Sequence, residues 1–264
     1  MKNLDDEYAN ATHIPGADKF VARWERNAAD FRKLLSQRGQ AELDTAYGDT
    51  DRQCFDLFAP KGSHKGVMIF VHGGFWLNFD KSYWSHLAQG AVEKGWYAAL
   101  PSYDLCPTVR IHQITSQIAQ AVKVISTRIS GPLALVGHSA GGHLVARMAV
   151  GELLPKALHA RIAKAMPISP LADLRPLRQT KMNQYFCLSD SDAMAESPAL
   201  MHRPSCNVHV WVGAEERAAF IDQARWLSDA WGAKLTLAPE KHHFDVIEAL
   251  SDPTSDMVAQ LLDG

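Results

Sequence analysis

The chain has 264 residues, of which 47% are hydrophobic and 21% are charged. These values are typical of a folded globular protein and exclude a disordered or collagen-like chain. Lysine and arginine number 27 against 29 acidic residues, a net charge of −2, and the basic residues form no dense cluster. A nucleic-acid partner is therefore not expected, since phosphate binding needs such a cluster. The length allows one large domain or two smaller ones.

The sequence also bounds the cellular setting. Residues 1–10 carry two Asp and one Glu and no apolar run, unlike a secretory signal. Every apolar run is far shorter than the roughly 20 residues of a membrane-spanning helix, so a cytoplasmic protein without membrane contact is predicted. The four cysteines lack a C-x-x-C pair and are predicted to be reduced thiols. The 12 histidines include no H-E-x-x-H motif, so neither a metal nor a cofactor is expected.

Hydrophobic periodicity predicts a series of helices and strands. Residues 17–38 place apolar side chains at steps of three or four, which predicts an amphipathic helix ahead of the first strand. Continuous apolar runs of strand length, such as 66–71 and 133–136, are typical of strands covered on both faces. The elements after residue 50 are expected in the order strand 54–58, strand 66–71, helix 80–94, strand 96–101, helix 110–129, strand 133–136, helix 141–151, strand 165–168, strand 208–212, helix 217–231, strand 234–237 and helix 244–262.

The alternation of strands and helices predicts the fold class. Right-handed β-α-β connections would give an α/β fold with a mostly parallel, doubly wound sheet and helices on both faces. Residues 172–206 hold four acidic residues, four serines and three prolines without a clear period. This stretch is expected to form a short, irregular, cap-like insertion over a site.

The most specific motif is Gly137-His138-Ser139-Ala140-Gly141, which directly follows a predicted strand and precedes a predicted helix. A G-x-S-x-G at a strand-to-helix turn is typical of a nucleophile elbow, in which small neighbours let the strained serine stand clear. The helix N-terminus beyond it offers free N–H groups and a positive dipole end to a developing oxyanion. Ser139 is therefore predicted to be the nucleophile, with the N–H of Ala140 in the oxyanion hole.

A second motif, His72-Gly73-Gly74-Phe75-Trp76, closes the strand 66–71. Two glycines after a buried strand let the backbone approach a ligand, and the N–H groups of Gly74 and Phe75 are predicted to complete the oxyanion hole. His72 is expected to brace this loop through hydrogen bonds, because the base of such a triad comes last in the chain. Gly73 supports the motif, and Trp76 is placed either beside an aryl leaving group or in the core.

A nucleophilic serine needs an orienting acid and a base, which follow it in the order acid then histidine. Two adjacent carboxylates, Glu215 and Glu216, follow one late strand, and two adjacent histidines, His242 and His243, follow the last strand. Spacing alone leaves open which member of each pair acts. Two other histidines are weaker candidates for the base, because one lies in the insertion and the other within a strand: His202 and His209.

These motifs resemble those of the α/β-hydrolase kynurenine formamidases, or arylformamidases, and their esterase relatives. The resemblance rests on residues 72–76, 137–142 and 243–245, and the H-G-G-x-W form of the first is its more specific part. Residues 103–107 and 169–177 also resemble segments of that family, so the likeness covers nearly the whole chain. The α/β-hydrolase fold is thus implied.

The family pattern also implies roles for the two open pairs. Its acid lies three residues beyond a glycine and four before a phenylalanine, which matches Gly213, Glu216 and Phe220 and favours Glu216. Glutamate here replaces the aspartate that the family usually has. The family's histidine precedes a phenylalanine and an acidic residue, which favours His243 over His242.

The expected reaction is acyl transfer to water by Ser139, His243 and Glu216. Residues so far apart in the chain need one sheet to unite them, so residues 1–264 are predicted to form a single domain, with 17–38 as an N-terminal helical extension. The resemblance implies an N-formyl aromatic amine such as N-formyl-L-kynurenine as substrate. A general short-acyl carboxylesterase with the same triad is the alternative, and a catalytically silent binding protein is a third hypothesis. The expected partner is a small-molecule ester or formamide, and a homodimer is left open.

Overall fold

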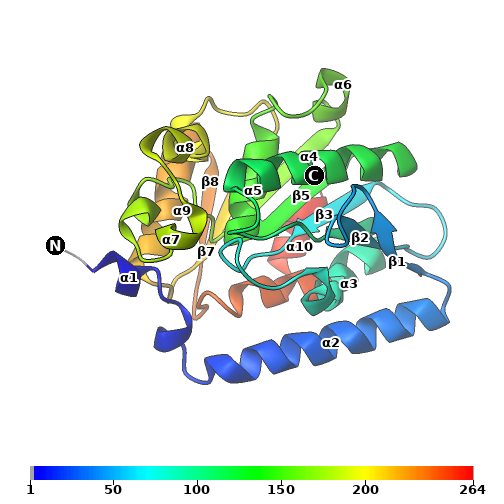
Figure 1. The fold of residues 1–264 in the computed structure, drawn as a ribbon. Helices are drawn as coiled ribbons and strands as arrows, with labels where there is room; N and C mark the ends of the chain where they lie inside the picture. The colour runs from blue at the N-terminus through cyan, green and yellow to red at the C-terminus, as the bar shows by residue number, and fades with distance from the viewer. Residues whose placement is uncertain (1–2, 264) are drawn as a thin grey trace.

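The computed structural model describes residues 3–263, which form an α/β fold around one sheet (Figure 1). Within these residues the sheet has eight strands in the order β1-β2-β4-β3-β5-β6-β7-β8. Neighbouring strands from β4 to β8 are parallel, whereas β1 with β2 and β2 with β4 are antiparallel. The strands are β1 (Ala41–Ala46), β2 (Cys54–Phe58), β3 (Val67–Val71), β4 (Tyr97–Pro101), β5 (Leu133–His138), β6 (Ile162–Ile168), β7 (Asn207–Gly213) and β8 (Lys234–Ala238).

Helices cover both faces of this sheet (Figure 1). Helices α2, α3 and α10 pack on one face, and α4, α5 and α9 pack on the other. Short helices and 3₁₀ turns, labelled η, complete the connections. The bounds are α1 (Leu4–Glu7), η1 (Ala11–His13), α2 (Ala17–Gln37), η2 (Lys81–Tyr83), η3 (Ser85–Ala88), α3 (Gln89–Glu93), α4 (Ile111–Arg128), α5 (Ala140–Ala149), α6 (Lys156–His159), η4 (Pro176–Gln179), α7 (Asn183–Phe186), α8 (Asp190–Ala195), η5 (Pro198–Leu200), α9 (Ala218–Trp231), η6 (Val246–Ser251) and α10 (Asp256–Leu262). No helix among residues 3–263 is long and apolar enough to cross a membrane.

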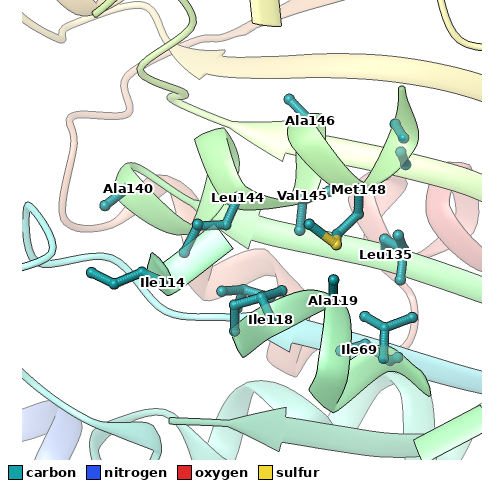
Figure 2. Close-up of a cluster of buried hydrophobic side chains, with 14 of the residues drawn as sticks. Ile69, Ile114, Ile118, Ala119, Leu135, Ala140, Leu144, Val145, Ala146 and Met148 are labelled. Carbon is teal, nitrogen blue, oxygen red and sulfur yellow. The ribbon is translucent and has the colours of Figure 1, made fainter. Parts of the chain in front are cut away.

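The continuous apolar runs of the sequence arise because both faces of the central strands are buried. In β3, Ile69 points into the layer under α4 and α5, whereas Met68 and Phe70 point into the layer under α2 and α3. Figure 2 shows part of the first layer, in which Ile118 of α4 and Leu144 of α5 belong to the same buried cluster as Ile69 and Leu135 of the sheet. Each such side chain contributes about 1.5–3 kcal/mol on burial, so the two layers fix the strands that carry the candidate site.

The antiparallel edge is the main departure from the predicted elements. Strand β1, with the sequence AELDTA, was not expected because it has charged residues and mostly exposed side chains. It lies at the edge of the sheet, where only one neighbouring strand and little core are available. Strand β2 leads directly into β3, as the order of the expected elements has it, and strands alternate with helices from β3 onward. A short, charged edge strand carries no apolar pattern by which a sequence could reveal it.

Two predicted helices are also broken in the structure. The range 80–94 is not one helix but contains η2, η3 and the short α3. Gly90 of α3 packs closely against η6, because a Cβ atom there would lie 2.4 Å from the carbonyl oxygen of Leu250. The range 244–262 divides into η6 and α10 around Pro253, and Ser255 caps the second helix by accepting a hydrogen bond from the N–H of Val258. Proline and a new N-cap both favour a helix boundary at this point.

The stretch 172–206 is more ordered than its lack of periodicity predicted. It contains η4, α7, α8 and η5, each of three to six residues. Leu174, Leu177 and Phe186 are buried within it, and Ser189 with Asp192 forms a capping box at the start of α8. Helices this short span less than two turns, so they cannot display the repeating apolar face that sequence periodicity detects.

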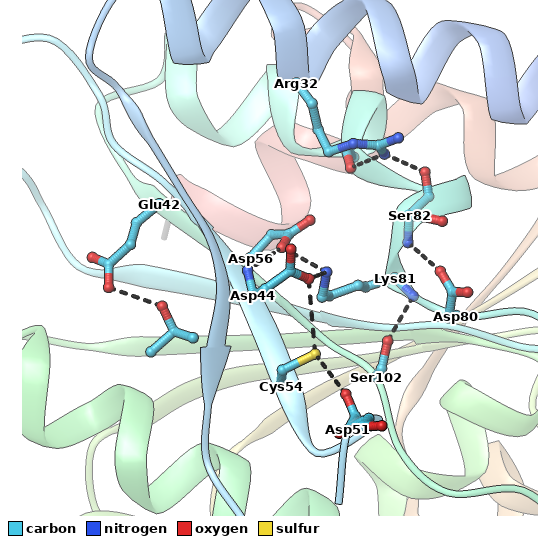
Figure 3. A network of polar contacts seen from close by, with 12 residues as sticks. Arg32, Glu42, Asp44, Asp51, Cys54, Asp56, Asp80, Lys81, Ser82 and Ser102 are labelled. Atoms are coloured by element: carbon cyan, nitrogen blue, oxygen red, sulfur yellow. Dashed lines mark hydrogen bonds and ion pairs between the residues drawn. The ribbon is translucent and has the colours of Figure 1, made fainter.

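A buried ion pair ties the antiparallel edge to the loop that follows residues 72–76 (Figure 3). Lys81 is 7% exposed, and its ammonium group lies 2.7 Å from Asp56 of β2 and 2.5 Å from Asp44 of β1. Burial alone would lower the pKa of Lys81, but the two carboxylates outweigh burial and raise that pKa. Because Asp56 is fully buried, its charge depends on Lys81 for compensation.

The variant Lys81→Met is expected to lower the free energy of unfolding by about 3–5 kcal/mol, because it leaves a buried carboxylate without its counter-charge. The same change at Lys94, whose ion pair with Asp263 is open to solvent, should cost about 1 kcal/mol or less. Urea unfolding of both variants measures the difference. Equal losses would contradict the importance given to Asp56.

Candidate active site

Ser139 occupies a strained turn between β5 and α5. Its backbone angles, φ 57° and ψ −117°, lie in a region that L-residues rarely adopt. A Cβ atom at Gly137 would lie 2.3 Å from the carbonyl oxygen of Gly141, and one at Gly141 would lie 2.0 Å from that of Val71. No side chain fits at either position, because Gly137 packs against the start of α5 and Gly141 packs against the end of β3. Ala140 begins α5, where a backbone N–H has no partner within the helix.

The loop after β3 packs directly against this turn. A Cβ atom at Gly73 would lie 2.9 Å from the carbonyl oxygen of His138 and 3.1 Å from the Cβ atom of Ser139. Gly74 and Phe75 then turn the chain with φ values of 109° and 54°. Within the described part of the chain, the N–H groups of these two residues donate no hydrogen bond. They therefore remain available to a ligand near the serine.

His72 stabilises the base of this loop. Its Nδ1 lies 2.8 Å from the carbonyl oxygen of Gly73, and its ring stacks on Tyr103 with a centroid separation of 4.2 Å. The Tyr103 hydroxyl donates to the carbonyl oxygen of His72 at 2.8 Å. Burial lowers the pKa of His72 to about 4, so the ring is neutral near pH 7. Hydrogen bonding and stacking thus hold the His72 ring in place at the start of the loop.

Trp76 lies in the core. It is 0% exposed and packs edge-on against His143 and Phe186, with centroid separations of 5.1 and 5.6 Å. It is not among the residues that line the cavity at Ser139. Trp76 was expected either beside an aryl leaving group or in the core, and the structure places it in the core.

Glu216 and His243 form a buried pair. Nδ1 of His243 lies 2.6 Å from Oε2 of Glu216. The other carboxylate oxygen, Oε1, accepts hydrogen bonds from the Ser169 hydroxyl at 2.5 Å and from the N–H of Gly213 at 2.8 Å. All three partners act as donors, which fixes the carboxylate and makes Nδ1 of His243 the protonated nitrogen. Nε2 is then the nitrogen that can accept a proton.

The structure distinguishes Glu216 from Glu215 and His243 from His242 by their surroundings. Glu215 is exposed, whereas Glu216 is buried beside His243. His242 lies outside this pair, with its Nδ1 3.2 Å from Asp245 and its ring against Phe20. The two weaker candidates are elsewhere, one exposed on the surface and one bonded to Thr236 within the sheet: His202 and His209.

Two buried rings pack against His243. The ring centroid of His138 lies 4.5 Å away and that of Phe220 lies 4.3 Å away. Burial, together with the neighbouring His243, lowers the pKa of His138 well below its ordinary value of 6.5. His138 therefore stays neutral and does not repel a protonated His243. Sequence reasoning gave no role to His138 or to the Ser169 hydroxyl, because nothing in a single sequence marks such tertiary contacts.

Ser139, His243, Gly74 and Phe75 open onto one cavity of about 660 Å³. More than half of its lining residues come from residues 5–24, whereas Met182 alone lines it from the stretch 172–206 that was expected to act as a cap. Within residues 3–263, no group of three or more His, Cys, Asp or Glu side chains is arranged to hold a metal ion. The aromatic lining residues are Tyr8, Trp24, Phe75, Phe79 and Phe244.

Comparison with known proteins places this chain among hydrolases. The kynurenine formamidase of Salmo salar is 29% identical to this chain over 244 residues, which cover 85% of this chain and 83% of that protein. A crystal structure from Silicibacter sp. TM1040, provisionally named a thioesterase, is 54% identical, covers 99% of both chains and superimposes with a TM-score of 0.96. Esterase 2 of Thermogutta terrifontis shares the fold at 16% identity and a TM-score of 0.64, covering 85% of this chain and 92% of that one.

The family comparison gives the broader assignment. A family model described as the alpha/beta hydrolase fold matches residues 68–209, which include β3 through β6 and the turn at Ser139. This match covers more than half of the 264 residues. The chain therefore belongs to the α/β-hydrolase family and is a hydrolase.

Proposed function

We propose that this hydrolase cleaves an aryl formamide, such as N-formyl-L-kynurenine, with Ser139 as nucleophile, His243 as base and Glu216 as orienting acid. The observation that carries the proposal is the buried contact of 2.6 Å between His243 and Glu216, in a cavity that Ser139 also lines. The three side chains follow one another in the order expected for this fold. The strained turn at Ser139 supports its role, because such turns present the nucleophile to the cavity.

In the first half of the reaction, Oγ of Ser139 attacks the formyl carbon while Nε2 of His243 takes the hydroxyl proton. Glu216 holds Nδ1–H and stabilises the imidazolium that forms. The carbonyl oxygen becomes an oxyanion, for which the N–H groups of Gly74, Phe75 and Ala140 serve as donors. Each such donor lowers the barrier by about 2.7–4 kcal/mol in comparable sites.

Collapse of this intermediate breaks the C–N bond, and His243 returns its proton to the departing aryl amine. A formyl ester of Ser139 remains. His243 then deprotonates a water molecule, which attacks the ester carbon and releases formate as the proton returns to Oγ of Ser139. The balance is one formamide and one water consumed for one amine and one formic acid produced, so the proposed route uses no cofactor.

Two observations favour a formamide of an aromatic amine. The curated relative from Salmo salar is named for that activity and matches 85% of this chain. The cavity also has an aromatic lining, contributed by Tyr8, Trp24, Phe79 and Phe244 among others, and such rings pack well against a planar leaving group. The general short-acyl carboxylesterase uses the same triad and is an outcome of the experiment below.

The test compares kcat/KM for N-formyl-L-kynurenine with that for p-nitrophenyl esters from acetate to octanoate. The formamide is expected to be preferred by about tenfold or more, after each rate is scaled by its uncatalysed hydrolysis. A flat preference for short esters would instead identify a carboxylesterase. Absence of turnover on every substrate, with an unreactive Ser139, would contradict the proposed triad and substrate.

A further inference from the structure

One wall of the active-site cavity comes from the N-terminal segment, defined here as residues 4–24. This wall is fixed to α9, the helix that packs beside His243. Nε2 of Gln223 donates to the Tyr8 hydroxyl at 2.8 Å, and Tyr8 is 2% exposed. Arg217, which directly follows the acid of the triad, pairs with Asp6 at 2.7 Å and with Glu7 at 3.2 Å. The N-terminal segment is thus a built part of the site.

The charged groups that line this cavity have one sign. Asp5 and Asp18 both belong to the lining, and within residues 3–263 the lining contains no lysine or arginine. His138, which also lines the cavity, is kept neutral by burial. One oxygen of Asp5 accepts the backbone N–H of Lys181 at 2.6 Å, and the nearby Arg217 is already paired with Asp6 and Glu7. No cation of the lining therefore neutralises the two carboxylates.

A buried amide completes this group. Asn10 lines the cavity and is 8% exposed. Its side chain caps no helix and makes no hydrogen bond with any other residue of the described range. Its polar atoms are not among the fully enclosed ones, so the amide keeps some exposure in a residue that lines the cavity. An amide without a partner in the chain takes its hydrogen bonds from water or from a bound ligand.

We propose that Asn10, Asp5 and Asp18 form a subsite that receives an ammonium group of the substrate. The amide oxygen and the carboxylates are acceptors, and a primary ammonium group has three N–H donors. The subsite favours ammonium-bearing substrates and disfavours those whose only charge is a carboxylate or phosphate, such as an acyl thioester of a phosphate-bearing carrier. It deepens the proposed function, since it orients an amine-bearing ester or formamide at Ser139.

The test measures three competitive inhibitors that share a benzyl or phenyl ring: benzylammonium, benzyl alcohol and benzoate. Inhibition constants are taken against p-nitrophenyl acetate, and dissociation constants are measured by calorimetry on the variant Ser139→Ala, so the subsite is tested even without turnover. Benzylammonium is expected to bind about tenfold tighter than benzoate, with benzyl alcohol between them. Benzoate binding as tightly as benzylammonium would overturn the subsite.

Variants of the three subsite residues test whether they cause the preference for benzylammonium over benzoate. Asp5→Asn and Asp18→Asn are each expected to reduce the benzylammonium-to-benzoate ratio by about threefold, and Asn10→Ala to weaken benzylammonium more than benzyl alcohol. Asp30→Asn is the matched control, because Asp30 is exposed on the same helix as Asp18 but outside the cavity. A ratio unchanged in the first two variants, or changed equally by Asp30→Asn, would also overturn the proposal. If the unmodified protein turns over no substrate but still binds benzylammonium tighter than benzoate, the triad is contradicted and the subsite is supported.

Discussion

Ser139→Ala is expected to reduce kcat/KM by about 10⁴- to 10⁶-fold on any ester or formamide that the protein accepts, because no other group can form the covalent intermediate. The fold should persist. The Ser139 side chain donates no hydrogen bond within the described residues, and alanine has the same Cβ atom at the strained φ of 57°. The residual rate reflects the oxyanion hole and substrate positioning alone.

The measurement is a steady-state assay of the purified variant, with circular dichroism and thermal unfolding as controls for folding. A melting temperature within a few degrees of the original, together with lost activity, is the expected combination. Retention of more than about a tenth of the activity by a folded Ser139→Ala variant would remove this residue from the nucleophile's role.

Glu216→Gln is expected to reduce kcat by about 10²- to 10⁴-fold. The carboxylate of Glu216 accepts from three donors, namely His243, the Ser169 hydroxyl and the N–H of Gly213. An amide has only one acceptor oxygen, so its NH₂ group must face at least one of these donors. If the NH₂ group faces His243, the ring must adopt the tautomer that cannot take the serine proton. If it faces Gly213 and Ser169 instead, the N–H of Gly213 loses its acceptor and no negative charge stabilises the imidazolium.

The matched control is Glu215→Gln, the same change one residue earlier. Glu215 is exposed, so its variant should stay within about twofold of the original activity. Both variants are assayed on the same substrate across a range of pH. A larger loss from Glu215→Gln than from Glu216→Gln would transfer the acid's role and would contradict the geometry described above.

The fold was predictable wherever burial leaves a local pattern. The runs that became β3 and β5 are apolar throughout because both of their faces are covered, and the face of α2 that holds Trp24, Ala28 and Phe31 is buried as its spacing indicated. The edge strand β1 and the helices of residues 172–206 lacked such patterns. Their positions depend on contacts with residues distant in sequence, and neither the composition nor the periodicity of the segment itself indicates those contacts.

The candidate site divides in the same way. The motifs at residues 72–76 and 137–141 are short enough to be recognised in the sequence, although Gly73 and Gly141 are required by the close packing of the two segments against each other. The choice of Glu216 and His243 from adjacent pairs needed the family resemblance in addition to spacing. The N-terminal wall could not be anticipated, because its anchor joins Tyr8 to Gln223, which are 215 residues apart in the chain. Tertiary contacts of this kind have no signature in one sequence.

The central claim is that Ser139 is a nucleophile activated by His243 and Glu216, and a fluorophosphonate tests it most directly. Attack by an activated serine forms an O–P bond and expels fluoride, which leaves a stable adduct that peptide mass spectrometry can locate. We expect one adduct, on Ser139, that is absent from Ser139→Ala and forms at least about 100-fold more slowly in His243→Ala. An unlabelled Ser139 in the folded protein, or an adduct on a different residue, would contradict the claim.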